Sequence, residues 1–249
     1  YNINLTTSVF NTLYLAEKNI QQNDGTRFLS NTTVNYKFTD DIKFSTRVAL
    51  DYVLGASHEY RNQFHGDAKG DNGYSYQSTN RTQTIAFTNT LSYDKNINDV
   101  HFISATAQME WQKNKSTTNS SSGENVAAEG LYYVGCFGTN QSAFGGLSYW
   151  KQISYLGLVN YSYMDKYIAD FSFKNEGSSR FALGYRFGNF WSAGVAWNVT
   201  NEDFLSDNKV VNNLKFRASI GETGSNIVGL NAYQSLFGYG NSYNDQGAV

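Results

Sequence analysis

The sequence contains no proline and only one cysteine, Cys136, among its 249 residues. A single cysteine cannot form an internal disulfide, and we expect Cys136 to be an ordinary loop residue. The missing proline fits a chain rich in strands, because proline removes a ladder hydrogen bond from a central strand. Charged residues make up 16% of the chain, against about 25% in ordinary globular proteins. The formal net charge of -2 gives no electrostatic basis for binding nucleic acid.

Long apolar runs are absent as well. No stretch of about 18 consecutive apolar residues occurs, which excludes a transmembrane helix. Membrane-spanning strands need an apolar residue only at every second position, so a barrel protein looks hydrophilic on average. The negative mean hydropathy of this chain is compatible with such strands.

The clearest pattern is an alternation of apolar and polar residues between Ile42 and Leu54, in which Thr46 is the only polar residue on the apolar side. One face collects Ile42, Phe44, Val48, Leu50, Tyr52 and Leu54, and the other collects Lys43, Ser45, Arg47, Ala49 and Asp51. A helix would not sort these residues, because its period is 3.6 residues and not 2. The run Phe28–Phe38 precedes it, and the turn at Thr39-Asp40-Asp41 predicts that the two form a hairpin.

Similar strands are predicted along the rest of the chain, about ten in all. They cover Thr82–Tyr93, Ile103–Trp111, Tyr155–Tyr163, Tyr167–Asn175, Phe190–Val199, Leu214–Ile220 and Tyr233–Tyr239, with a helical turn capped by Asn201. The connections near Asp40, Asn96 and Asp165 are short, whereas His65–Tyr76 and Lys113–Leu147 look like long loops. Outer-membrane barrels sort their connections in this way, with short periplasmic turns and long extracellular loops.

Aromatic residues are abundant and are expected near strand ends. They include Tyr36, Tyr52, Tyr93, Trp111, Tyr161, Tyr163, Tyr167, Trp191 and Trp197. In a barrel they would form girdles at the membrane interfaces. The alternative is the ordinary preference of tyrosine and tryptophan for strands.

Four motifs between Ser154 and Tyr233 carry a family resemblance. They read YLGLVNYSY, EGSSRF, NEDFL and LKFRASIGETGSN, in that order. This region resembles the SusC/RagA family of TonB-linked outer-membrane transporters of Bacteroidetes. The resemblance implies a plug domain inside a barrel of roughly 22 strands, coupling to the TonB complex, a SusD-like surface lipoprotein, and import of glycans or peptides. It implies neither a cofactor nor an enzymatic activity.

On this basis the predicted fold class is all-β, an antiparallel transmembrane β-barrel segment that forms an open curved sheet in isolation. Residues 1–249 are expected to be part of the barrel domain, because the chain begins at Tyr1 without a signal peptide and ends at Val249 in a polar turn. The plug domain and the last strands are expected to lie outside it. Ile42, Phe44, Val48, Leu50 and Tyr52 should face lipid, while Lys43, Arg47 and Asp51 face the lumen.

No catalytic or metal-binding group stands out. His58 and His65 are interpreted as scattered surface histidines, and Asp67–Gly73 as a solvated loop that lacks the closing glutamate of a calcium site. Ser178-Ser179-Arg180 has no paired base and is therefore not a nucleophile motif. The family resemblance implies that it is a structural marker. Ligand contacts are expected from aromatic residues of the long Lys113–Leu147 loop and just beyond it, with Tyr132, Tyr133, Tyr149 and Trp150 as the candidates.

The predicted function is therefore part of an active outer-membrane nutrient transporter that contacts outer-membrane lipid. A passive outer-membrane porin or adhesin barrel is one alternative. A secreted, soluble all-β carbohydrate-binding module is another.

Overall fold

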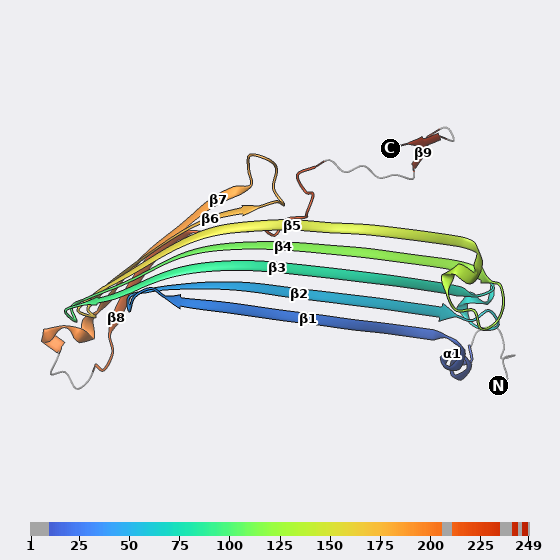
Figure 1. The fold of residues 1–249 in the computed structure, drawn as a ribbon, viewed down its shortest axis with the longest axis horizontal. Helices are drawn as coiled ribbons and strands as arrows, with labels where there is room; N and C mark the ends of the chain where they lie inside the picture. The colour runs from blue at the N-terminus through green and yellow to red at the C-terminus, as the bar shows by residue number, and fades with distance from the viewer. Residues whose placement is uncertain (1–9, 206–210, 235–240, 244–245, 249) are drawn as a thin grey trace. The chain divides into compact units, whose positions relative to one another are not determined.

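The computed structural model describes residues 10–205, 211–234, 241–243 and 246–248. Eight strands form one antiparallel sheet in the order β1 to β8, so that each strand pairs with its neighbours in sequence (Figure 1). The sheet is open, because β1 and β8 stand at its two ends. Among the described residues, no helix is both long enough and apolar enough to cross a membrane.

The first five strands are much longer than the last three. They are β1 (Ile20–Lys37), β2 (Ile42–Arg61), β3 (Tyr74–Ile97), β4 (His101–Val126) and β5 (Phe137–Tyr163), followed by β6 (Tyr167–Ser178), β7 (Phe187–Asn198) and β8 (Lys215–Glu222). The short strands β9 (Asn241–Tyr243) and β10 (Gln246–Ala248) pair only with each other. One helix, α1 (Thr12–Lys18), precedes β1, and single 3-10 turns occur at Asp67–Lys69, Val134–Cys136, Val199–Asn201 and Asp203–Leu205.

The chain divides into two compact units. One comprises Asn31–Ala49, Ile85–Lys113 and Trp150–Val249, and it contains the short turns. The other comprises the chain up to Ser30, Leu50–Thr84 and Asn114–Tyr149, and it contains the longer connections.

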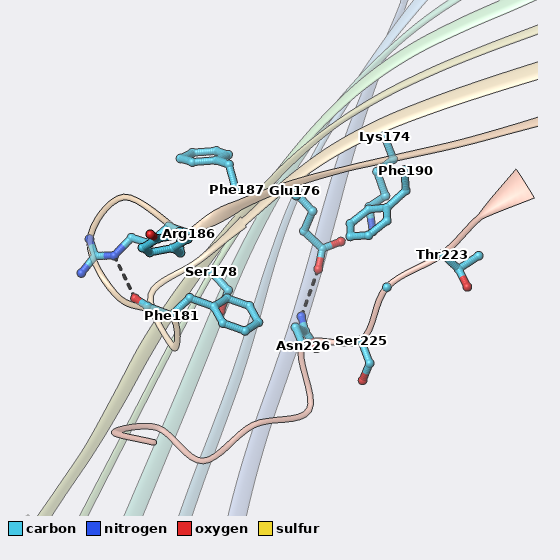
Figure 2. A pocket seen from close by; sticks show the side chains of 13 residues that line it. Lys174, Glu176, Ser178, Phe181, Arg186, Phe187, Phe190, Thr223, Ser225 and Asn226 are labelled. Carbon is cyan, nitrogen blue, oxygen red and sulfur yellow. Dashed lines mark hydrogen bonds and ion pairs between the residues drawn. The ribbon is translucent and has the colours of Figure 1, made fainter. Parts of the chain in front are cut away.

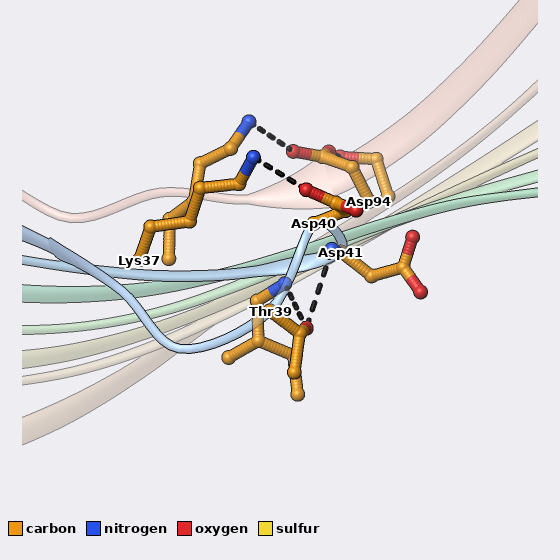
Figure 3. A network of polar contacts seen from close by, with 8 residues as sticks. Lys37, Thr39, Asp40, Asp41 and Asp94 are labelled. Atoms are coloured by element: carbon orange, nitrogen blue, oxygen red, sulfur yellow. Dashed lines mark hydrogen bonds and ion pairs between the residues drawn. The ribbon is translucent and has the colours of Figure 1, made fainter.

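In the first of these units, the predicted hairpin turn between β1 and β2 is confirmed. The Thr39 hydroxyl accepts hydrogen bonds from the backbone amides of Asp41 (3.3 Å) and Ile42 (3.0 Å). Beside it, the Lys37 ammonium lies 2.6 Å from the Asp40 carboxylate, as Figure 3 shows. A threonine that bonds the backbone two and three residues ahead is a common way to hold a tight turn without glycine.

The other two short turns use left-handed backbone at both central positions. Asn98 and Asp99 have φ of 56° and 55°, and Met164 and Asp165 have φ of 52° and 53°. Two-residue turns of this mirror-image kind match the right-handed twist of the strands that they join. The Met164 amide also donates to the Val100 carbonyl at 2.7 Å, so neighbouring turns are tied to each other.

The same unit confirms that the sheet has two chemically different faces. A hollow on one face is lined by Phe44, Leu91, Met109, Tyr155 and Phe173, which come from five successive strands. A hollow on the opposite face is lined mainly by polar residues, namely Ser104, Thr106, Asn160, Asp170, Ser172 and Ser192, together with Leu158, Val159 and Phe171. We call these the apolar face and the polar face. Lys43 lies 3.9 Å from Asp94 of the adjacent strand β3, which agrees with the polar side predicted for β2.

The second unit surrounds the longer connections. Its buried cluster consists of Tyr60, Val126 and Phe137, with Ile20 and Cys136 packed against it. Asn19, which follows α1, accepts hydrogen bonds from both nitrogens of Asn62, the backbone amide (2.9 Å) and the side-chain amide (2.7 Å). These contacts hold α1 against the connection between β2 and β3. Cys136 is a free, half-buried cysteine in the connection between β4 and β5, as expected of a loop residue.

Several expectations from the sequence are wrong in detail. Most of the expected Lys113–Leu147 loop is strand, because β4 continues to Val126 and β5 begins at Phe137. Serine, threonine and asparagine fill this stretch, and such residues are tolerated in a strand whose backbone is paired on both sides. Because β2 continues to Arg61 and β4 continues to Val126, Tyr52 and Trp111 lie in the middle of their strands and not near the ends. The expected strand Tyr233–Tyr239 lies mostly outside the described residues.

Candidate functional site: a pocket on the polar face

The polar face of β6, β7 and β8 is built from cross-strand rows. Asp170 pairs with Gly194, Ser172 with Ser192, and Lys174 with Phe190. The Ser172 and Ser192 hydroxyl oxygens lie 2.6 Å apart, so these rows are linked through side chains as well as backbone. Residues directly opposite each other in an antiparallel pair share a face, which places all of these side chains on one side of the sheet.

A pocket of about 480 Å³ opens on this face where β6 and β7 approach their connecting loop (Figure 2). The strands contribute Lys174, Glu176, Ser178, Phe187, Gly188 and Phe190, the loop contributes Phe181, Tyr185 and Arg186, and the segment after β8 contributes Thr223, Gly224, Ser225 and Asn226. The pocket volume falls within the range of small-molecule sites. Two of the four motifs of the family resemblance, EGSSRF and the GETGSN end of LKFRASIGETGSN, therefore meet in one pocket.

The segment Thr223–Gly229, which we call the strap, is held on the polar face by Asn226. The Asn226 side-chain amide donates 3.0 Å hydrogen bonds to the Gln152 side-chain oxygen and to a Glu176 carboxylate oxygen. Gln152 donates to the same Glu176 oxygen, also at 3.0 Å. The other Glu176 oxygen forms an ion pair with Lys174. Glu176, whose side chain is 14% exposed, thus has both oxygens occupied, as a half-buried carboxylate requires.

The Ser178-Ser179-Arg180 motif extends this attachment. The Ser179 amide donates to the Lys151 carbonyl at 2.9 Å, and the Ser179 hydroxyl accepts from the Lys151 amide at 2.8 Å. Arg180 donates to the Val228 carbonyl of the strap at 3.2 Å. Its guanidinium carbon lies 5.1 Å from the centre of the Trp150 ring, a cation–π distance. The motif is therefore structural, as the sequence predicted.

Glycines allow the phenylalanine ring at the centre of the pocket to lie against backbone. A Cβ atom added to Gly224 would lie 2.2 Å from the Phe190 ring, and one added to Gly188 would lie 2.8 Å from it. These approaches are closer than any side chain with a Cβ permits, so the ring is clamped between two glycines. This contact explains why glycine stands in the GETGSN motif, at a position where the backbone has no unusual φ.

The interior of the pocket combines aromatic rings with polar groups whose main partners are one another. Within the described part of the chain, no group of three or more histidine, cysteine, aspartate or glutamate residues could hold a metal ion.

A second polar cluster lies at the short-turn end of β6 and β7. Glu202 accepts hydrogen bonds from the Tyr167 hydroxyl (2.7 Å) and the Trp197 indole nitrogen (2.9 Å). Lys166 lies between Glu202 (3.2 Å) and Asp203 (3.0 Å). The Tyr167 hydrogen bond, followed by that from Trp197, lowers the pKa of Glu202. The hydrogen bond to Asp203, followed by that to Glu202, raises the pKa of Lys166.

The four predicted ligand-contacting residues are not assembled into one loop. Tyr132 packs edge-on against Tyr60 at 4.8 Å, and Tyr133 stacks on His58 at 5.0 Å. Tyr149 and Trp150 are residues of β5, and they fall in different units. Tyr133 is the most open of the four, with 62% of its surface exposed. Whether these residues contact a ligand stays a prediction.

The interpretation of His65 as a surface histidine is wrong. It is 8% exposed, and its Nε2 accepts a 2.7 Å hydrogen bond from the Asn11 amide. The rings of Phe10 and Tyr14 pack edge-on against it. This burial could not be predicted from the sequence pattern, because Phe10, Asn11 and Tyr14, which precede β1, cover the position.

A sheet whose strands pair in chain order, with one apolar and one polar face, has the form of the wall of an up-and-down β-barrel. Solved structures confirm this fold. The structure of the RagAB peptide transporter matches 99% of this chain and 28% of its own, with a TM-score of 0.86 and 19% sequence identity. The RagAB peptide importer in its open-open state matches equally well, with a TM-score of 0.86 over all of this chain.

Sequence comparison shows which receptors the chain is similar to. The chain is 38% identical over 92 residues to the TonB-dependent receptor SusC of Bacteroides thetaiotaomicron, which covers 36% of this chain and 9% of SusC. It is 26% identical over 261 aligned positions to the TonB-dependent receptor P3 of Formosa agariphila, which covers 98% of this chain and 24% of P3. The predicted similarity to SusC/RagA-type TonB-dependent receptors is thereby confirmed. No family model matches the chain.

The chain spans about a quarter of the length of the P3 receptor and of the RagAB chain to which it is similar. These relatives are named as receptors and transporters and not as enzymes.

Proposed function

We propose that this chain forms part of the barrel wall of a TonB-dependent transporter that imports nutrients across the outer membrane of a Bacteroidetes-like bacterium. The observation that carries the proposal is the two-faced antiparallel sheet, together with its similarity to TonB-dependent receptors along nearly the whole chain. In this arrangement the apolar face contacts lipid and the polar face contacts the lumen. Residues 1–249 belong to the barrel domain in this proposal.

The proposed partners follow from the same similarity. A SusD-like lipoprotein would cap the outer mouth, and the TonB complex would supply energy through a plug domain. The substrate class is a glycan or a peptide, and the likeness to a solved peptide transporter supports a peptide. No catalytic role is proposed for any residue.

The pocket on the polar face then opens toward the lumen. The Tyr185 ring, which lines the pocket and is 82% exposed, is the kind of group that contacts small ligands with apolar surfaces. Tyr132, Tyr133, Tyr149 and Trp150 are proposed as further contacts, with Tyr133 the best placed by its exposure. These assignments concern contact with substrate and not the energy-coupled step.

Energy dependence separates the proposal from a passive porin. The complete gene that encodes this chain is deleted from its host and restored on a plasmid, and uptake of labelled oligosaccharides and peptides is measured with and without a protonophore. We expect restored uptake that a protonophore abolishes. Uptake that persists without the proton gradient contradicts the proposal in favour of a passive barrel, and a protein found in the medium supports a secreted module.

A further inference from the structure

The apolar face contains a trough at the short-turn end of β5 to β8. Its floor is a cross-strand row of small side chains, Ala169, Val195 and Ala218, which pair in register across β6, β7 and β8. The next row toward the turns is large: Tyr167 pairs with Trp197, and Trp197 with Phe216. The change from small to large side chains between neighbouring rows creates a recess of about 450 Å³.

The wall of the trough has its polar atoms turned toward the short turns. The Tyr167 hydroxyl and the Trp197 indole nitrogen both donate to Glu202, so their ring surfaces are left for the trough. Tyr161 of β5, which pairs with Ala169, adds another ring. Aromatic side chains with one apolar and one polar end are typical of the level of lipid headgroups.

Charge at the mouth of the trough has a definite sign. Lys166 is only 15% exposed and lies between two carboxylates, whereas the Asp203 side chain is fully exposed at 100%. With Glu202 the three residues carry a net negative charge. An anionic headgroup is repelled here, and an ammonium group is attracted and can donate a charge-assisted hydrogen bond.

We propose that this trough is a binding site for a phospholipid with a primary-ammonium headgroup, of the phosphatidylethanolamine type, in the leaflet on the short-turn side. One acyl chain lies on the floor of Ala169, Val195 and Ala218, and the ammonium group meets Asp203. The inference rests on the proposed function, which places the apolar face in lipid. It adds a specific lipid and a specific position to a surface that would otherwise contact the membrane without preference.

The test uses the complete transporter that contains this chain. The protein is reconstituted in nanodiscs with equal amounts of phosphatidylethanolamine, phosphatidylcholine and phosphatidylglycerol, and native mass spectrometry counts the lipids that remain bound. We expect retention of phosphatidylethanolamine over phosphatidylglycerol by roughly two- to fivefold, since an ion pair with an exposed carboxylate has about that effect. Equal retention of the two lipids overturns the proposal.

Three variants localise the effect. Ala169→Leu fills the trough and displaces about two methylene groups of the acyl chain, which lowers retention by roughly tenfold. Ala193→Leu makes the same change on the apolar face outside the trough and leaves retention unaltered. Asp203→Asn keeps the lipid but removes the headgroup preference. Wild-type retention in Ala169→Leu contradicts the proposal.

The heat-dependent gel mobility of a folded barrel separates the two proposals. A wild-type protein that never inserts into the nanodisc overturns both the proposed function and the lipid site. A protein that inserts and supports energy-dependent uptake, but shows no lipid preference, overturns the lipid site alone.

Discussion

Placing an arginine at Phe171 tests which face of the sheet meets lipid. Phe171 is on the apolar face of β6, in register with Ala193 of β7, and 49% of its surface is exposed in the isolated chain. Its neighbour Ser172 points to the opposite face, where it contacts Ser192. Two substitutions one residue apart, Phe171→Arg and Ser172→Arg, therefore place the same charge on the two faces at nearly the same depth.

The depth follows from strand geometry. From Tyr167, at the aromatic row, to Phe171 the strand advances four residues, about 13 Å. At a tilt of about 45° this corresponds to about 9 Å of depth. The apolar band of such barrels is about 25 Å tall, so Phe171 lies close to its midplane. An arginine on the lipid side at this depth costs about 2–4 kcal/mol of folding free energy, whereas positions facing the lumen tolerate charge.

The assay is reversible folding of the complete protein in phospholipid vesicles, with guanidinium as denaturant and tryptophan fluorescence as the signal. We expect Phe171→Arg to lower the free energy of unfolding by about 2–4 kcal/mol and Ser172→Arg to lower it by less than about 1 kcal/mol. Equal losses for the two variants, or a larger loss for Ser172→Arg, would refute the assignment of the faces.

Three further predictions concern the strap and the short turns. Asn226→Asp places a second carboxylate beside Glu176, so amides of the strap should exchange hydrogen faster; unchanged exchange would contradict the role of this side chain. Gly224→Ala forces a methyl group into the clamped ring and should cost about 1–3 kcal/mol, whereas Gly229→Ala, whose Cβ meets only an ordinary 3.8 Å contact, should cost much less. Because the pKa of Glu202 is lowered in the folded state, its contribution to stability is complete above its ordinary value of 4.5 and is lost as the pH falls through the lowered pKa. Hydrogen exchange of the backbone amides around Lys166 and Tyr167, which Glu202 contacts, should therefore accelerate only below about pH 4.5. Acceleration near neutral pH would contradict the assignment to Glu202.

The sequence predicted the two faces well, because a period of two residues depends only on strand geometry. Phe44 and Phe173 line a common hollow on the apolar face, as the alternation requires. The turn at Thr39 was predictable for a similar reason, since the hydroxyl and the amides that it bonds are local in sequence.

Strand length was not predictable in the same way. Polar residues such as those between Lys113 and Val126 have weak strand preferences on their own, and pairing with neighbouring strands decides their conformation. This explains why β4 and β5 are far longer than the alternation alone indicated.

The pocket on the polar face could not be predicted from the sequence either. Its existence depends on the strap returning to the polar face, through bonds such as that between Asn226 and Gln152, 74 residues apart in sequence. The motifs EGSSRF and GETGSN lie in this region of the sequence. Their role depends on the hydrogen bond from Arg180 to the Val228 carbonyl of the strap, a contact between residues 48 positions apart.

The most direct test of the central claim is a scan of single spin labels along β6 of the complete protein in outer-membrane vesicles, with Cys136 replaced by serine. Labels at residues 169 to 174 are exposed in turn to oxygen, which concentrates in lipid, and to a water-soluble nickel chelate. We predict that labels at positions 169, 171 and 173 collide mainly with oxygen, and labels at positions 170, 172 and 174 mainly with the nickel chelate. Equal accessibility at all six positions, or the opposite alternation, would contradict a barrel wall with its apolar face in the membrane.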